Sequence, residues 1–344
     1  MLASCRPAPV RAPRRAKPAP ARQAPQCSKA AHRQRDLGHP PRTIDLHGAP
    51  AAMSTLRRVW WHLNRTPAAY AFKAVQRVRY AHEVAQRRRL RESFPAEAAY
   101  RQKAADLKAL GYTDLTDILA PELTRSLAEA SARKVERAAA LADVQTLTHK
   151  SFWVRLLDED APGGQFSSDN VFVRFAMQPA ILGVVTVRLG ELPRLTDVLL
   201  TYSRPNAVEL RYSQLWHRDY DDVHTLKVFV YLTDVADIDD GPFTFIPGPA
   251  SDRVGFTVRS HLTDGKLFSR VGRDAVREMR GPRLTAFACE TSRCLHMGSR
   301  LAPGHARLMY TATFISAPSV YPGVMPRFRL VGSATAAERL VLGV

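Results

Sequence analysis

The stretch between residues 193 and 318 constrains the fold most, because short apolar segments alternate there with turn residues. Six segments are rich in β-branched, aromatic and other apolar residues and are bounded by proline, glycine or aspartate, a pattern typical of β-strands. They cover residues 197–202, 210–217, 226–233, 243–247, 283–289 and 307–315. The sequence between them predicts no helix of convincing length that could connect parallel strands. We therefore expect an antiparallel sandwich or barrel.

Helices are expected before this stretch. Residues 54–91 carry apolar side chains at spacings of three and four with arginines between them, which predicts an amphipathic helix. Pro121 opens a second helical segment, 121–143, because proline is favoured in the first turn of a helix. A third segment, 180–192, is apolar and ends before Pro193. The expected fold class is mainly β, with flanking helices and an N-terminal helical region.

The formal net charge of +18 is distributed unevenly along the 344 residues. Residues 1–52 hold ten basic and two acidic residues, and residues 53–100 hold ten basic and three acidic residues. The remainder of the chain therefore carries only +3. A nearly neutral main body argues against a nucleic acid as the partner of the main domain.

The domain organisation follows from composition. The first 52 residues hold nine of the 24 prolines and no aromatic residue, so they cannot bury enough apolar surface to fold. We expect a disordered head at 1–52, with Met53 as an alternative start of the chain. A basic helical extension at 53–103, a main domain at 104–330 with its strands at 197–318, and a C-terminal tail at 331–344 are expected to follow.

Two interpretations of the basic helix at 54–91 stay open. It combines arginines with Trp60 and Trp61, a composition that suits the surface of an anionic membrane. Alternatively, the tryptophans pack on the main domain while the arginines face water.

Cysteine usage and hydropathy indicate a soluble, cytoplasmic protein. The four cysteines, Cys5, Cys27, Cys289 and Cys294, form no framework of disulfides, which makes a reducing compartment the default. No apolar stretch approaches the roughly 18 residues that span a bilayer.

One His-x-Asp sequence, within Trp216-His217-Arg218-Asp219, stands at the end of a predicted strand. Positions i and i+2 of a strand point to one face, so the imidazole and the carboxylate converge. These are two of the three ligands of a site built from two histidines and one carboxylate. With 11 histidines and 32 acidic residues in 344 positions, about one such pair is expected by chance, so its setting has to support it.

His296 is the best-placed third ligand, because it follows the predicted strand at 283–289 and precedes the one at 307–315. Arg307 stands eleven residues after it, and its planar guanidinium can bind a carboxylate through two parallel hydrogen bonds. A zinc site of Cys289, Cys294 and His296 is the alternative. Its spacing matches no structural zinc pattern, and a fourth ligand is missing.

From about residue 198 to 318 the chain resembles the phytanoyl-CoA dioxygenase family of Fe(II)- and 2-oxoglutarate-dependent oxygenases. The resemblance rests on the ordered set Trp216-His217-Arg218-Asp219, Asp239-Asp240-Gly241-Pro242, Phe245-Ile246-Pro247-Gly248, Gly281, His296 and Arg307. It implies a double-stranded β-helix, or jelly roll, in which His217, Asp219 and His296 hold Fe(II). It also implies that Arg307 binds the distal carboxylate of 2-oxoglutarate. The implied reaction is hydroxylation of a small organic substrate by O₂, with release of succinate and CO₂.

Three residues bear on this resemblance without being metal ligands. Ser251 stands where the family often has a histidine, and Pro282 stands after Gly281 where an aspartate is usual. Lys227 is a second candidate contact for 2-oxoglutarate, and its alternative is a strand-end lysine that reaches solvent. The runner-up function is a catalytically silent protein of this fold that uses residues 1–91 to bind nucleic acid or an anionic membrane. The retained ligand set and Arg307 favour the enzyme.

Overall fold

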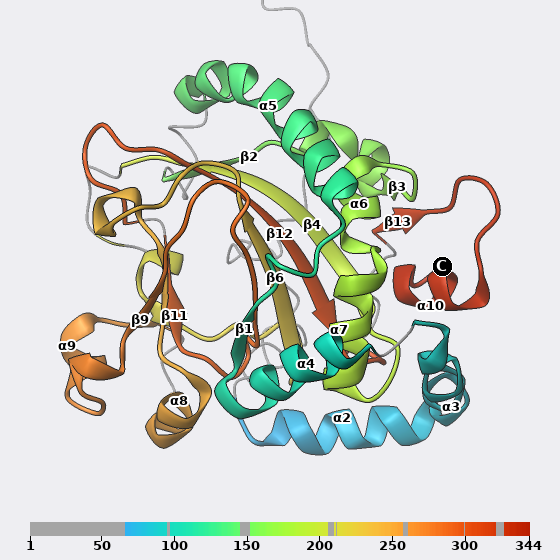
Figure 1. Cartoon of the computed structure of the whole chain (residues 1–344). Helices are drawn as coiled ribbons and strands as arrows, with labels where there is room; N and C mark the ends of the chain where they lie inside the picture. The colour runs from blue at the N-terminus through green and yellow to red at the C-terminus, as the bar shows by residue number, and fades with distance from the viewer. Residues whose placement is uncertain are drawn as a thin grey trace, which may run out of the picture. The chain divides into compact units, whose positions relative to one another are not determined.

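Two antiparallel sheets form the centre of the protein, which we describe from a computed structural model of the whole chain (Figure 1). The structure describes residues 66–94, 97–144, 152–205, 210, 212–256, 261–298, 300–320 and 327–344. All of these belong to one compact unit, Asp45–Val344. The expected disordered head, 1–52, and the first part of the basic helix, 54–65, lie outside the described residues.

The larger sheet has six strands, and every neighbouring pair in it is antiparallel. In spatial order they are β1 (Tyr112–Asp114), β10 (Ala286–Cys289), β6 (Thr225–Tyr231), β12 (Arg307–Ile315), β4 (Arg194–Ser203) and β2 (Trp153–Arg155). This spatial order differs from the chain order, so strands distant in sequence become neighbours. The register pairs Lys227 of β6 with Cys289 of β10 and with Thr313 of β12.

The smaller sheet has five short antiparallel strands. In spatial order they are β8 (His261–Leu262), β5 (Trp216–His217), β11 (His296–Met297), β7 (Phe243–Phe245) and β9 (Arg277–Met279). The register places His217 directly opposite His296 on one side and His261 on the other. A separate parallel pair joins β13 (Phe328–Arg329) to β3 (Phe166–Ser167).

Aromatic side chains fill the space between the two sheets. Phe229 of β6 lies 4.7 Å from Phe243 of β7, measured between ring centroids. Phe287 of β10 lies 5.5 Å from Phe243. Because side chains alternate along a strand, Val228 and Val230 of β6 point the other way and join the cluster beneath the helices. The six-stranded sheet is therefore buried on both faces.

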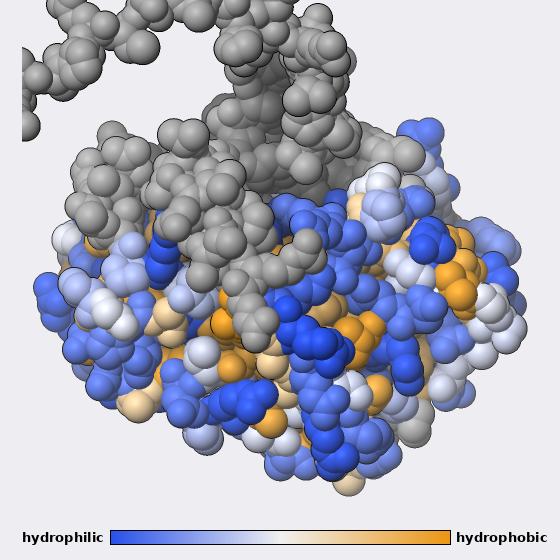
Figure 2. Space-filling model, turned by 90° about the horizontal axis from the view of Figure 1, so that it is seen from above, coloured by the Kyte–Doolittle hydropathy of each residue, from blue (hydrophilic) through white to orange (hydrophobic). Residues whose placement is uncertain are grey.

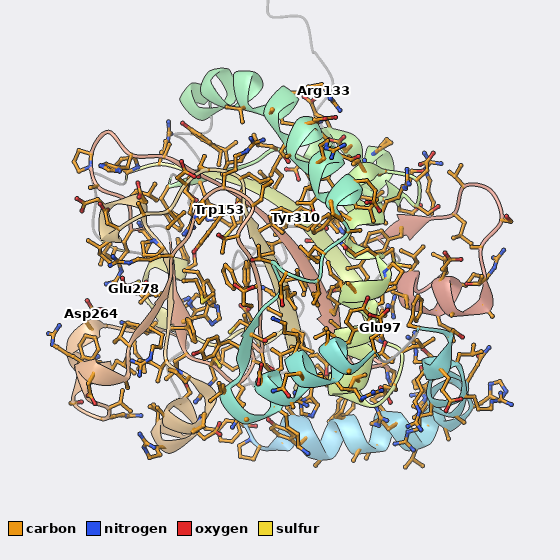
Figure 3. All side chains as sticks on the ribbon, viewed as in Figure 1. Glu97, Arg133, Trp153, Asp264, Glu278 and Tyr310 are labelled. Atoms are coloured by element: carbon orange, nitrogen blue, oxygen red, sulfur yellow. The ribbon has the colours of Figure 1, made fainter. Side chains whose placement is uncertain are left out.

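Helices cover the outer face of the six-stranded sheet (Figure 1). They are α4 (Ala98–Leu110), α5 (Pro121–Val144), α6 (Val171–Ala176), α7 (Pro179–Leu189) and α10 (Ala336–Leu342). Residues 180–186 of α7 are all buried, and the helix ends at Gly190, whose φ of 73° suits glycine. Tyr310 of β12 points into this layer (Figure 3), and its hydroxyl donates to Phe172 O at 2.6 Å.

Short helices connect the remaining elements. The α-helices α8 (Gly248–Val254) and α9 (Asp264–Phe268) flank the five-stranded sheet. The 3₁₀ turns cover Leu90–Ser93, Asp158–Asp160, Pro162–Gly164, Tyr212–Gln214, Ile238–Asp240 and Arg273–Ala275.

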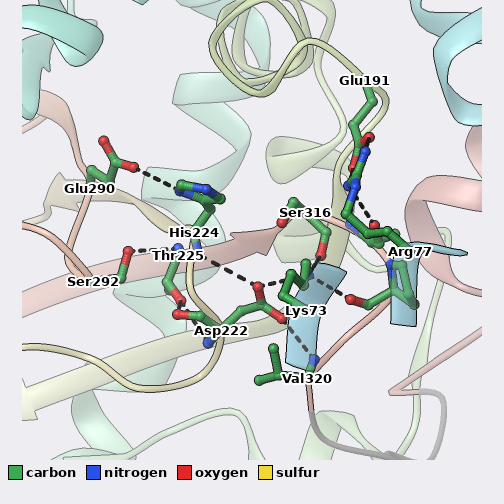
Figure 4. A network of polar contacts seen from close by, with 12 residues as sticks. Lys73, Arg77, Glu191, Asp222, His224, Thr225, Glu290, Ser292, Ser316 and Val320 are labelled. Carbon is green, nitrogen blue, oxygen red and sulfur yellow. Dashed lines mark hydrogen bonds and ion pairs between the residues drawn. The ribbon is translucent and has the colours of Figure 1, made fainter. Parts of the chain in front are cut away.

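The described part of the basic helix forms two helices, α2 (Ala68–Arg79) and α3 (Ala81–Arg89), which are separated at Tyr80. Both pack against the main body through charged side chains. Lys73 Nζ lies 2.8 Å from Asp222 Oδ1, and Arg77 forms an ion pair with Glu191 (Figure 4). Trp60 and Trp61, for which the two interpretations stay open, lie outside the described residues, whereas Arg77 and Arg87 of the described part point inward.

Several strands lie where the sequence predicts them. The range 307–315 coincides with β12, and residues 226–233 contain most of β6. The expected strand at 210–217 is mostly wrong: residues 212–214 form a 3₁₀ turn and only the last two are extended. The 103/104 boundary falls inside α4, and the segment 331–344, expected as a tail, contains α10, in which Val341 is buried. In the described part of the chain, no helix is long and apolar enough to cross a membrane.

Candidate metal centre

His217, Asp219 and His296 form a cluster at the centre of the five-stranded sheet. One candidate ligand atom from each lies within 4.8 Å of the other two. His217 Nε2 is 3.9 Å from Asp219 Oδ1, and His296 Nε2 is 3.7 Å from Asp219 Oδ2. These separations exceed a hydrogen bond but suit atoms that share one ion at roughly 2.1 Å.

Backbone carbonyls orient both imidazoles in the same way. His217 Nδ1 lies 2.9 Å from Leu215 O, and His296 Nδ1 lies 3.0 Å from Cys294 O. A carbonyl can only accept, so Nδ1 carries the proton and Nε2 keeps its lone pair. Burial, and for His217 also the neighbouring His296, lowers the pKa of both imidazoles. Both histidines are therefore neutral donors whose Nε2 atoms face the carboxylate.

Asp219 is an ionised carboxylate in a buried site. Burial by itself disfavours the charge, but the Lys227 ammonium holds the pKa of Asp219 well below its ordinary range. Lys227 Nζ lies 2.9 Å from Asp219 Oδ2 and 3.6 Å from Asp221 Oδ2. These two carboxylates outweigh the burial of Lys227 and raise its pKa. The ammonium supplies the positive charge that a metal ion would add at the same carboxylate.

Contacts outside the cluster hold the His-x-Asp segment in place. The Asp219 N–H donates to Thr291 O at 2.9 Å, which ties the segment to the turn between β10 and β11. Arg218 points away from the ligands and donates to three backbone carbonyls, those of Ser251, Gly255 and Arg293. A two-residue strand such as β5 cannot hold its own direction, so these bonds set the angle at which the ligands meet.

Trp216 and Ser251 anchor the other side of the same strand. Trp216 Nε1 donates to Asp264 Oδ1 at 2.8 Å, and Arg300 bonds both oxygens of that carboxylate. Ser251 Oγ donates to Ile246 O and accepts from Leu295 N, both at 2.9 Å. Ser251, which replaces the histidine that is common in the resembled family, thus joins α8 to β7 and β11.

Arg307 stands two residues before Met309 in β12, so both side chains point to the same face of the strand. Met309 belongs to the aromatic cluster between the sheets, and Arg307 therefore points between the sheets too. Its side chain is buried, and one amino group donates to Gly241 O. The other lies 3.8 Å from the position that a Cβ on Gly298 would occupy. Gly298 stands two residues after His296, which corresponds to roughly 6.6 Å along a strand. The guanidinium therefore lies beside the end of the ligand-bearing strand β11.

The residues present fit a divalent metal ion with open positions. Two neutral imidazole nitrogens and one carboxylate on one side of an ion are the donor set of non-haem Fe(II) oxygenases. Asp219 Oδ2 is buried and, among the described residues, accepts no well-aligned hydrogen bond, although Lys227 is close. The Lys227 ammonium already offsets the charge of this buried oxygen, so the fit to a metal ion rests on the type and convergence of the three donors. The His-Asp-His cluster is thus able to hold a metal ion.

The structure places the other sequence candidates as follows. Lys227 does not reach solvent, because its ammonium lies on Asp219. Cys289 and Cys294 are buried free thiols. Among the described residues, the cluster that could hold a metal ion consists of His217, Asp219 and His296 and includes neither cysteine. Cys5 and Cys27 lie outside the described residues.

Sequence reasoning missed Thr291 and His261. Thr291 carries no motif, so no signal marks it. The ring of His261 lies 5.4 Å from that of His217, but its strand of two residues is too short to be predicted.

No protein-family model and no curated protein sequence matches the chain. Among solved structures it is similar to EctD from S. alaskensis with 2-oxoglutarate and 5-hydroxyectoine, at 18% identity over 65% of this chain and 78% of that chain, with a TM-score of 0.46. It is also similar to the epimerase SnoN in complex with Fe³⁺, alpha ketoglutarate and nogalamycin RO, at 17% identity over 66% of this chain and 87% of that chain, with a TM-score of 0.43. HygX from Streptomyces hygroscopicus, with nickel and 2-oxoglutarate bound, is 15% identical over 63% of this chain and 87% of that chain, with a TM-score of 0.41. Similarity at this level carries no argument about the chemistry of this chain, which rests on its own residues.

Proposed function

We propose that this chain is an Fe(II)- and 2-oxoglutarate-dependent oxygenase that hydroxylates a small organic substrate and releases succinate and CO₂. One observation carries the proposal: two neutral imidazoles and one ionised carboxylate converge, and the guanidinium of the buried Arg307 of β12 lies beside the end of β11. The resemblance to the phytanoyl-CoA dioxygenase family points the same way.

The core is proposed to be a double-stranded β-helix. The arrangement of a six-stranded and a five-stranded antiparallel sheet around an aromatic layer supports this assignment. Short strands that carry the ligands in the smaller sheet are consistent with it, because neighbouring strands then bring His217 and His296 into register.

His217, Asp219 and His296 would hold Fe(II), which would supply O₂ activation coupled to oxidation of the 2-oxo acid. Three protein ligands leave positions for the cosubstrate and O₂. The carboxylate ligand fills the position that a halide would need, which favours hydroxylation over halogenation. The chain itself binds, orients and shields the reactants.

Arg307 is proposed to bind the distal carboxylate of 2-oxoglutarate. The spacing of two strand residues between His296 and Gly298 suits an extended five-carbon dicarboxylate that reaches from the ligands to the guanidinium. Lys227 is the second candidate cosubstrate contact, because its ammonium already faces a carboxylate in the cluster. The aromatic layer covers one side of His296, with the Phe243 ring 5.3 Å from it between ring centroids.

The test is anaerobic loading of the full chain with Fe(II) and 2-oxoglutarate, followed by exposure to O₂ with a panel of small substrates. We expect a charge-transfer absorption on anaerobic loading and succinate formation in air. A chain that binds neither Fe(II) nor 2-oxoglutarate would leave the silent scaffold as the better interpretation.

A further inference from the structure

Helix α2 buries two polar side chains beside Ala69 and Phe72 and exposes apolar side chains on its outward side. Lys73 and Gln76 are buried, at 4% and 9% exposed, whereas Val75 and Val78 are 62% and 78% exposed. A helix on the surface of a globular protein normally has the opposite orientation, because burial of apolar area stabilises the fold. The exposed valines of α2 therefore leave an apolar surface outside the core.

The inward face of α2 is well satisfied, so its orientation is fixed by the fold. Lys73 Nζ donates to Asp222 Oδ1, Ser316 O and Pro318 O at 2.8, 2.8 and 2.5 Å (Figure 4). Arg77 donates to both oxygens of Glu191. Turning the helix over would leave Asp222 and Glu191 without their positively charged partners, which costs more than exposing two valines.

Apolar residues gather on the outward side. We call the exposed side chains Tyr70, Val75, Val78, Tyr80 and Phe256 the α2 patch. Phe256 lies outside α2 and joins the patch through Tyr70, with ring centroids 6.4 Å apart. All five rank among the exposed large hydrophobic residues of the described chain. On the face shown in Figure 2, by contrast, hydrophobic residues are dispersed among hydrophilic ones, as is usual for a protein surface.

Exposed arginines without acidic partners stand at the end of α2, along α3 and in the 3₁₀ turn after it. Arg79, Arg88, Arg89 and Arg91 are exposed. Within the described residues none of these four forms an ion pair, whereas Arg87 is paired with Glu83. Residues 66–94 contain seven basic and two acidic residues. The α2 patch together with these arginines suits a partner whose interior is apolar and whose surface is negatively charged.

The charge distribution selects among the possible occupants. A second copy of this chain related by a two-fold axis would bring the same arginines face to face. The segment 54–65 directly before α2 is also basic, with Arg57, Arg58 and Arg65 and no acid. Like charges disfavour both. An anionic lipid surface offers the opposite charge to the arginines and an acyl boundary to the valines and tyrosines.

We propose that the α2 patch and these exposed arginines dock the protein on membranes that contain anionic lipids. The valines and the two tyrosines enter the interface between headgroups and acyl chains, and the arginines bind lipid phosphates and carboxylates. This attachment is peripheral and reversible, because the apolar area is small and α2 stays bound to the core through Lys73 and Arg77.

The test is co-sedimentation of the full-length chain with vesicles of phosphatidylcholine alone or of phosphatidylcholine mixed with phosphatidylserine. We expect binding to the mixed vesicles only, and weakening with added salt. The double variant Val75→Asp/Val78→Asp should abolish it. Arg88→Ala/Arg89→Ala should weaken it roughly 30-fold, as expected for two arginines at about 1 kcal/mol each.

Matched controls separate the α2 patch from the basic head. Ile238→Asp/Val331→Asp changes exposed hydrophobic residues elsewhere, and Arg125→Ala/Arg133→Ala removes exposed arginines of α5, which lies far from α2 in Figure 1. Both controls should bind as the parent protein does. If the α2 variants also bind like the parent, residues 1–65 make the contact and the proposal is overturned.

The other two occupants give different results. A second copy on the patch would appear as a dimer in sedimentation equilibrium that the double valine variant dissociates. Cover by residues 54–65 would prevent vesicle binding by the full chain, and the double valine variant would then lower the thermal unfolding midpoint. Membrane docking predicts a monomer at the patch and an unchanged midpoint for that variant.

Discussion

Lys227 Nζ lies 2.9 Å from Asp219 Oδ2, so the proposed iron ligand already has a positive partner inside the protein. Both side chains are largely buried, at 13% and 10% exposed. A buried carboxylate is costly without a counter-charge. The ammonium therefore keeps Asp219 ionised in the metal-free protein.

The first prediction is that Lys227→Met destabilises the metal-free protein more than the metal-bound protein. Removing one partner of a buried ion pair costs about 3–5 kcal/mol, and a bound divalent ion replaces the missing charge. Thermal unfolding with and without Mn(II), with Lys227→Arg as the control that keeps the charge, measures the difference. An equal loss in both states would mean that the lysine is not the counter-charge of the site.

The second prediction concerns Asp219. The variant Asp219→Ala removes the anionic donor between the two imidazoles, so Fe(II) affinity should collapse while the fold survives. Titration with Fe(II) under anaerobic conditions and far-UV circular dichroism measure the two effects. Asp221→Ala is the control, because Asp221 also faces Lys227 but lies outside the cluster; it should bind Fe(II) almost as the parent does.

The third prediction is that Arg307→Lys weakens 2-oxoglutarate binding and leaves Fe(II) binding nearly unchanged. The lysine keeps the charge but loses the planar pair of donors, at a cost of about 1.5–3 kcal/mol. Anaerobic titration of the Fe(II)-loaded protein with 2-oxoglutarate gives the affinity. Arg300→Lys, at an arginine paired with Asp264, serves as control. Unchanged affinity in Arg307→Lys would remove this residue from the cosubstrate site.

The fourth prediction is a pH dependence at Asp264. Its hydrogen bonds with Arg300 are the largest cause that lowers the pKa of this carboxyl, and the Trp216 indole also contributes. A lowered folded pKa stabilises the protein above the unfolded value of about 3.9 and loses that effect as pH falls through the folded pKa. Since the side chain is 44% exposed, Asp264→Asn should cost only about 1 kcal/mol at neutral pH.

Urea unfolding of the parent and of Asp264→Asn at neutral and acidic pH measures this effect. The gap between the two proteins should shrink as the pH falls from about 3.9, the unfolded value, through the lowered pKa of the folded parent carboxyl. A gap that stays constant across this range would show that the charge of Asp264 contributes nothing and that its hydrogen bonds alone hold Trp216.

The convergence of His217, Asp219 and His296 and several elements could be predicted from the sequence. Pro121 correctly opens α5, and the continuous apolar run at 307–315 gives β12. The i, i+2 spacing of His217 and Asp219 predicts a shared strand face from local sequence alone, although β5 ends at His217 and Asp219 follows in the loop. Strands of two residues, such as β5 and β8, escape prediction because their extension comes from neighbouring strands and from side chains like Arg218.

The sequence alone determined which residue types and spacings are available: one His-x-Asp pair, a later histidine, an arginine eleven residues beyond it, and an amphipathic α2. Only the tertiary structure decided what these meet. The contact of Lys227 with Asp219 depends on the position of β6 beside the loop after β5, and no local pattern encodes it. The same holds for α2, because periodicity reveals that a helix has two faces but not which one the core will take. That choice depended on Asp222 and Glu191, buried acids from distant segments that bind Lys73 and Arg77.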